Sequence, residues 1–227
     1  MAHTISAPDV VASHPRLSAR TLLLGGALAG PVFLISGFTQ GLTREAFDFS
    51  RHPLSILANG DLGWIQVTTF IISGLLTLAA AMGFRAAMPS GRGSTWVPRL
   101  MAIWALGQIG AGIFRADPGL GFPSGTPDEQ GTLSTAGILH MVFGQLAFIS
   151  AIIVCFIMAR RFAAEGKRGW RLFSLVTGVV FTAAIVGLST GGGTNPIILT
   201  GFYAGVTLSF AWLTLLSLRF RGRRPAR

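Results

Sequence analysis

Two histidines and two aspartates have the types and positions that could carry acid–base chemistry in this chain. His52, Asp61 and Asp117 lie in polar segments between apolar stretches, whereas His140 lies inside an apolar stretch. Ionisable groups within such stretches are costly to bury and tend to be functional. An imidazole beside a carboxylate can act as a general base, and both groups are also metal ligands. His140, His52, Asp61 and Asp117 are therefore candidate catalytic residues.

Structural roles compete with catalysis at each of these positions. An aspartate next to proline or glycine commonly caps a helix or closes a turn, which applies to Asp61 and Asp117. A neutral imidazole bonded to a neighbouring helix is an equally good interpretation of His140. No His-x-x-x-His or His-Glu-x-x-His pair occurs in the sequence. We therefore predict neither a metal site nor a cofactor.

Four further polar residues are candidate ligand-binding groups. Arg51 and Arg115 could contact an anionic group of a ligand. Gln66 lies near the start of one apolar stretch, and Gln108 lies seven residues before Arg115, hence on the same helical face. Glutamines in such stretches also commonly join one helix to another by hydrogen bonds. If these side chains meet at one depth, they form a polar pocket.

The elements that must position these groups are transmembrane helices. Hydrophobic residues make up 51% of the chain, charged residues only 11%, and the mean hydropathy is +0.61. A soluble domain has about 25% charged residues. We predict an all-α fold, a six-transmembrane-helix bundle. The expected spans are about 21–38, 62–81, 100–114, 134–158, 172–188 and 197–218. The glycine pairs Gly26/Gly30 and Gly201/Gly205 are spaced for close helix packing.

The basic residues are sorted between alternate gaps of this pattern. All but three of the 18 Lys and Arg residues lie in the gaps on one side, the exceptions being Arg44, Arg51 and Arg115. Because positively charged loops resist translocation, both termini are predicted to be cytoplasmic. Two long extracytoplasmic loops, about 39–62 and 115–132, then hold most of the candidate residues. The first of these loops should also contain a short interfacial helix near 50–58.

The chain divides into one membrane domain and two short ends. We expect a disordered cytoplasmic N-terminus at 1–18, the six-helix domain at 19–219 and a basic cytoplasmic tail at 220–227. The first span lacks a good cleavage site and is expected to remain as a helix. The net charge of +10 does not indicate nucleic acid, because the basic residues flank apolar spans. The expected partners are the bilayer and anionic lipids at its cytoplasmic face, and a homo-oligomer is left open.

Two groups of residues resemble a known family. The first is Arg51-His52-Pro53-Leu54-Ser55, followed by Gly60-Asp61 and Gly63-Trp64-Ile65-Gln66. The second is Gly112-Ile113-Phe114 with Asp117-Pro118, Gly121-Phe122-Pro123 and His140. Together they resemble the bacterial membrane proteins grouped as domain of unknown function 998, over about 25–215. The resemblance implies a six-helix bundle in the bacterial cytoplasmic (inner) membrane. The resemblance implies no particular activity. It does place the candidate residues at positions that belong to the motifs of this family.

Three functions remain open from the sequence. The favoured one is binding or transport of a lipid headgroup or small polar molecule through a polar pocket at the extracytoplasmic face. The alternative is an intramembrane hydrolase or lipid-modifying enzyme, metal-dependent or not, using His140 or His52 with Asp61 or Asp117. The third is a non-catalytic membrane scaffold. The surroundings of His140 distinguish them: a nearby carboxylate around a vacant space favours an enzyme, and a backbone carbonyl in a packed core opposes it.

Overall fold

The chain is all-helical in the computed structural model, which describes residues 17–129, 131–190 and 195–222. Within these ranges there are six α-helices, one short 3₁₀ helix and no β-strand. The α-helices are α1 (Ala19–Thr43), α2 (Gly63–Ala87), α3 (Trp96–Ile113), α4 (Thr135–Ala164), α5 (Arg168–Ser189) and α6 (Pro196–Arg221). The 3₁₀ helix, η1, is Leu54–Ala58. The predicted all-α fold is thus confirmed. Most of the predicted disordered N-terminus and basic tail lies outside the described residues.

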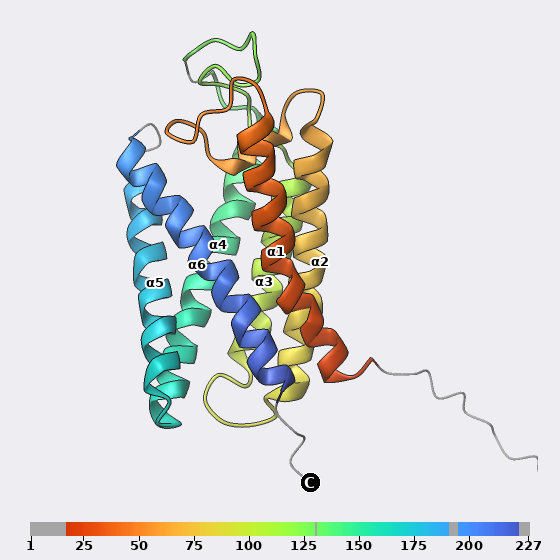
Figure 1. The fold of residues 1–227 in the computed structure, drawn as a ribbon, viewed down its shortest axis with the longest axis vertical. Coiled ribbons are helices and arrows are strands. Elements are labelled where there is room, and N and C mark those ends of the chain that lie inside the picture. The colour runs from red at the N-terminus through yellow and green to blue at the C-terminus, as the bar shows by residue number, and fades with distance from the viewer. Residues whose placement is uncertain (1–16, 130, 191–194, 223–227) are drawn as a thin grey trace, which may run out of the picture.

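The six helices form a closed ring. Each helix packs against its neighbours in sequence, and α6 packs against α1 as well as α5. Figure 1 shows α6 crossing the bundle from the end of α5 toward the start of α1. The residues between α1 and α2 and those between α3 and α4 lie at one end of the ring, which we call the loop end. The chain enters α1 and leaves α6 at the opposite end.

Small residues allow α1 to approach α6 closely. A methyl group on Gly26 would collide with Ser217 Oγ, and one on Gly30 would lie 2.8 Å from the carbonyl oxygen of Phe210. The predicted close contact at this glycine pair is therefore present. For the second predicted pair, Gly201 and Gly205, the close contact is present only at Gly205. Gly205 packs against Phe181, but nothing lies within 4 Å of the corresponding position on Gly201.

Five of the six helices are long and apolar enough to cross a membrane, namely α1, α2, α4, α5 and α6. Many of their large apolar side chains face outward, as in a protein whose solvent is lipid. These features indicate a multi-pass membrane protein. A crossing by α3, the cytoplasmic location of the termini and the bacterial inner membrane remain predictions.

The third helix starts earlier than the sequence indicated. It begins at Trp96 rather than near residue 100, so Arg99 lies within its first turn. The Arg99 guanidinium is 5.5 Å from the Trp96 ring, so it packs along the helix end instead of terminating it. A charge at the edge of an apolar stretch was a poor guide to the helix boundary.

The half of the bundle away from the loop end is solidly packed. Its largest fully buried side chains include Phe84, Met101, Met158, Phe162 and Trp212. The Trp212 indole donates a hydrogen bond to Ser174 Oγ at 2.9 Å, which joins α6 to α5. The hollow part of the molecule lies in the other half, toward the loop end.

Candidate functional site

A cavity of about 420 Å³ occupies the loop-end half of the ring. Its volume lies within the range of about 300–1,000 Å³ that is typical of small-molecule sites. All six helices and both long loops contribute to the wall. Aromatic side chains form much of it, including Phe33, Phe70, Trp104, Phe148, Phe181 and Phe202. The space is therefore mainly apolar, unlike the polar pocket that the sequence suggested.

The cavity opens sideways between α4 and the end of α5. Leu133 and Met141 line it although they are 50% and 44% exposed, and exposed Ser189 lines it from the end of α5. Figure 1 shows α4 and α5 together at the opposite end and apart toward the loop end. Met141 is the seventh residue of α4, which is long and apolar enough to span a membrane, so at Met141 the opening would face lipid.

The long loops cover the loop end of the cavity. Residues 53–56 line it, and Leu54, Ile56, Leu57 and Ala58 are buried. The short helix predicted near 50–58 thus exists as η1, but it is packed into the bundle and not interfacial. Its sequence, Leu-Ser-Ile-Leu-Ala, is mostly apolar, so burial against the helices is more favourable than exposure on the surface.

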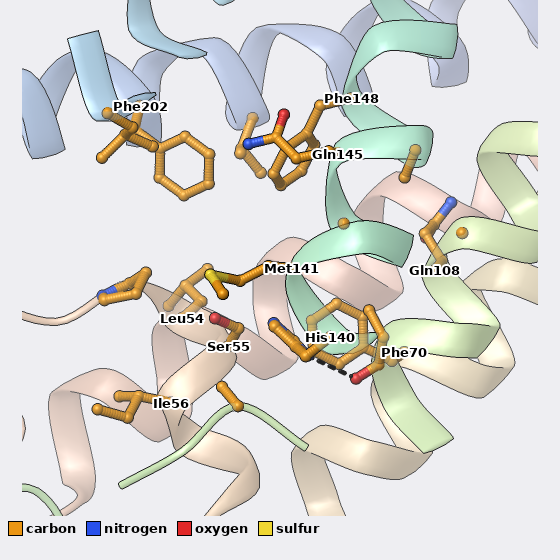
Figure 2. Close-up of a pocket in the computed structure, with 18 of the residues that line it drawn as sticks. Leu54, Ser55, Ile56, Phe70, Gln108, His140, Met141, Gln145, Phe148 and Phe202 are labelled. Atoms are coloured by element: carbon orange, nitrogen blue, oxygen red, sulfur yellow. Dashed lines mark hydrogen bonds between the residues drawn. The ribbon is translucent and has the colours of Figure 1, made fainter. Parts of the chain in front are cut away.

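Among the described residues, His140 has partners for Nδ1 but none for Nε2. Nδ1 lies 2.9 Å from the carbonyl oxygens of both Ala111 and Phe114. Because carbonyls only accept, Nδ1 must carry the proton. These carbonyls lie at the end of α3, where helical hydrogen bonds run out, so His140 caps that helix. Figure 2 shows the bonded carbonyl on one side of the ring and Met141, Ser55 and Leu54 on the other.

His52 is buried, at 1% exposure, and both of its ring nitrogens are bonded. Nδ1 accepts a hydrogen bond from the Asp48 amide at 2.9 Å. Nε2 therefore carries the proton and donates to the Leu120 carbonyl at 2.8 Å. The Tyr203 hydroxyl donates to the His52 carbonyl oxygen. His52 thus ties the first long loop to the second and to α6, and neither nitrogen is free to act as a base in this arrangement.

The two candidate aspartates have different surroundings and different structural roles. Asp117 lines the cavity, but Oδ1 accepts from Ser134 Oγ at 2.5 Å and Oδ2 from the Ser134 amide at 2.8 Å. Ser134 caps α4, so Asp117 supports a helix N-terminus, where a negative charge is favourable. Asp61 is exposed near Arg44. Burial lowers the pKa of the Arg44 guanidinium, and attraction to Asp61 opposes that shift.

The candidate arginines do not reach the cavity wall. Arg51 pairs with Asp128 at 3.3 Å, and the two side chains are 43% and 82% exposed. Arg115 is exposed and has no hydrogen-bond or ion-pair partner among the described residues. Exposed arginines at this end remain available to solvent or headgroups. The structure does not direct them at a ligand inside the bundle.

The candidate glutamines join helices, as their alternative interpretation proposed. Gln66 accepts a hydrogen bond from Gln40 at 2.8 Å between α2 and α1. Gln108 accepts from Ser73 at 2.9 Å and donates to Thr77 at 3.2 Å, between α3 and α2. Gln108 also lines the cavity, whereas Gln66 does not.

The structure therefore brings only His140, Asp117 and Gln108 of the candidates to one cavity. Within the described part of the chain, no group of three or more His, Cys, Asp or Glu side chains could hold a metal ion. Sequence reasoning missed Arg44, which donates to the carbonyls of Leu57 and Asn59 at 2.5 and 2.6 Å and shapes the loop cover. The one feature of the sequence that could have drawn attention to Arg44 is that it is among the three basic residues on the loop side.

Fold and site together define a class: a multi-pass helical membrane protein with a loop-covered, laterally open cavity. The chain belongs to the family described as "Protein of unknown function (DUF998)", whose sequence profile matches residues 27–219. This confirms the resemblance seen in the sequence. No curated protein and no solved structure matches the chain significantly.

Proposed function

We propose that this protein binds a lipid-like amphiphile that enters from the bilayer between α4 and α5. The observation that carries the proposal is the cavity itself: about 420 Å³ of mainly apolar space, open to the side of the bundle. A small polar molecule would lose its hydration there without gaining enough hydrogen bonds. An alkyl chain instead exchanges lipid contacts for aromatic ones.

Charge and packing narrow the proposal further. No Arg or Lys lines the cavity in the part of the chain that the structure describes, so a buried anionic headgroup would lack a counter-ion. The opposite half is filled by side chains such as Trp212 and Phe84, so the cavity does not continue through the bundle. Binding therefore fits this conformation better than passage across the membrane. The enzyme alternative has the free Nε2 of His140, but no ion pair joins that ring to a carboxylate among the described residues.

Photolabelling tests the proposal. The protein in phosphatidylcholine nanodiscs is exposed to dodecyl methyl ether carrying a diazirine in its chain, and labelled peptides are mapped by mass spectrometry. We expect saturable labelling of cavity-lining segments of α4, α5 and α6. Uniform, non-saturable labelling of the outer helix faces would contradict the proposal.

One glycine allows the cavity to be filled without disturbing its wall. Gly144 lines the cavity, and a methyl group there would meet only Phe148, at 3.9 Å. Gly144→Leu should therefore fold and reduce the saturable labelling several-fold. Gly201→Leu is the matched control, because Gly201 is also helical and uncrowded but does not line the cavity. Equal labelling of the two variants would count against the cavity as the binding site.

A further inference from the structure

Most polar side chains in the cavity wall already have partners within the protein. Gln108 and Asp117 are bonded as described above, and the Tyr203 hydroxyl donates to the His52 carbonyl oxygen. Ser189 and Ser209 donate to backbone carbonyls of their own helices at 2.9 and 2.8 Å. The hydroxyl protons of these residues are therefore not available to a ligand. These polar side chains stabilise the cavity wall.

Four polar groups in the wall are left over. His140 Nε2, the Ser55 hydroxyl, the Gln145 amide and the Trp104 indole N–H make no hydrogen bond with any described residue, and all four residues line the cavity. Figure 2 shows Ser55 and His140 near each other toward η1, while Gln145 lies further along α4, beside Phe148 and across from Phe202. The cavity thus has a polar spot beneath the loop cover and a mainly aromatic remainder.

The tautomer of His140 decides which hydrogen-bonding group this spot can recognise. Nδ1 is committed as a donor to two carbonyls, each 2.9 Å away, so the neutral ring presents Nε2 as an acceptor. An acceptor in an apolar space requires a donor from the ligand. A carboxylate or phosphate offers only acceptors and would meet this lone pair without a cationic side chain to balance it. An ammonium group could also donate to this nitrogen, but the one carboxylate among the described lining residues, Asp117, lies at the N-terminus of α4, where the helix dipole disfavours a cation.

Building on the proposed function, we infer that the ligand is a neutral long-chain amphiphile whose polar group donates a hydrogen bond to His140 Nε2. A long-chain alcohol is the simplest member of this class. Its hydroxyl would lie between His140 and Ser55, donating to the imidazole and accepting from the serine. Its chain would lie along the aromatic wall formed by residues such as Phe148 and Phe202.

Competition against the ether photolabel tests this inference on the unmodified protein. Dodecanol, dodecyl methyl ether and dodecanoate share one chain and differ in the headgroup. One hydrogen bond contributes about 0.5–1.5 kcal/mol. Dodecanol should therefore compete about two- to twelvefold better than the ether, which cannot donate. Dodecanoate should compete less well than dodecanol at pH 9, where it is ionised even in the bilayer. Equal competition by alcohol and ether, or stronger competition by dodecanoate, would overturn the inference while leaving the proposed function in place.

A substitution then assigns the preference to one side chain. His140→Phe keeps a ring against Phe70, whose centroid lies 6.1 Å away, but removes the acceptor. This variant should still bind the ether label and should lose the advantage of alcohol over ether. Retention of the full preference by His140→Phe would refute the role of His140. Absence of saturable cavity labelling in the wild-type protein would instead refute the proposed function and the inference together.

Discussion

Replacing His52 with phenylalanine tests whether this histidine holds the loop cover or performs chemistry. His52→Phe keeps an aromatic ring in its place among Phe47 and Phe122, whose centroids lie 5.5 and 5.7 Å from the imidazole. It removes both hydrogen bonds of the ring, the one from the Asp48 amide and the one to the Leu120 carbonyl. The change thus separates hydrogen bonding from packing.

The expected loss of stability follows from the surroundings of these two groups. Asp48 is exposed, so water can replace the bond to its amide at a cost of about 0.5–1 kcal/mol. Leu120 is half-buried, so water can rehydrate its carbonyl only in part after the substitution, and the loss of this hydrogen bond should cost about 1–3 kcal/mol. The free energy of unfolding should fall by about 1.5–4 kcal/mol. For a soluble protein of this size, that corresponds to a melting temperature lower by roughly 3–16 °C.

Thermal unfolding in detergent and amide hydrogen exchange provide the measurements. Exchange should increase in residues 44–62 and 114–129, which His52 connects, and stay unchanged in the packed half around Trp212. Trp64→Phe serves as a control, because Trp64 is 60% exposed on the outer face of α2. A His52→Phe protein with wild-type stability and wild-type loop exchange would refute the structural role assigned to this residue.

Two further changes test local features. Gly205→Ala should destabilise the protein by about 1–2 kcal/mol in thermal unfolding, because the added methyl would lie 2.7 Å from the Phe181 ring; Gly201→Ala, with open space, should be neutral or stabilising by up to about 1 kcal/mol. A reversed order would contradict the packing described for α6. Hydrogen bonds from the Ser50 hydroxyl and amide lower the pKa of Asp48 below 3.8. A depressed carboxyl pKa stabilises the folded form above the unfolded value, and this contribution is lost as the pH falls through the folded pKa. Asp48→Asn should therefore be less stable than the wild type at pH 7, and the difference should shrink below pH 3.8; parallel unfolding curves at all pH values would rule out this contribution.

The bonding state of individual side chains explains why the candidate site was predicted only in part. His140 was a good candidate because an ionisable group within an apolar stretch needs a reason, and it does line the cavity. His52 and Asp117 were equally plausible from their residue types. In the structure their polar atoms are engaged by groups 4 to 68 positions away along the chain, such as the Asp48 amide, Ser134 and the Leu120 carbonyl. Sequence spacing alone does not show which of these partners a side chain will meet in the fold.

The sequence alone determined the helical architecture and the family. Apolar runs near bilayer length permit only helices whose backbone groups are satisfied internally, and that constraint is local to each run. Closure of α6 onto α1, the burial of η1 and the lateral opening at Met141 were decided by the tertiary structure. The same is true of the His140 tautomer, which depends on two carbonyls from α3. Each of these features is set by which side chains meet across the ring, a balance of packing and hydrogen bonding that no single segment contains.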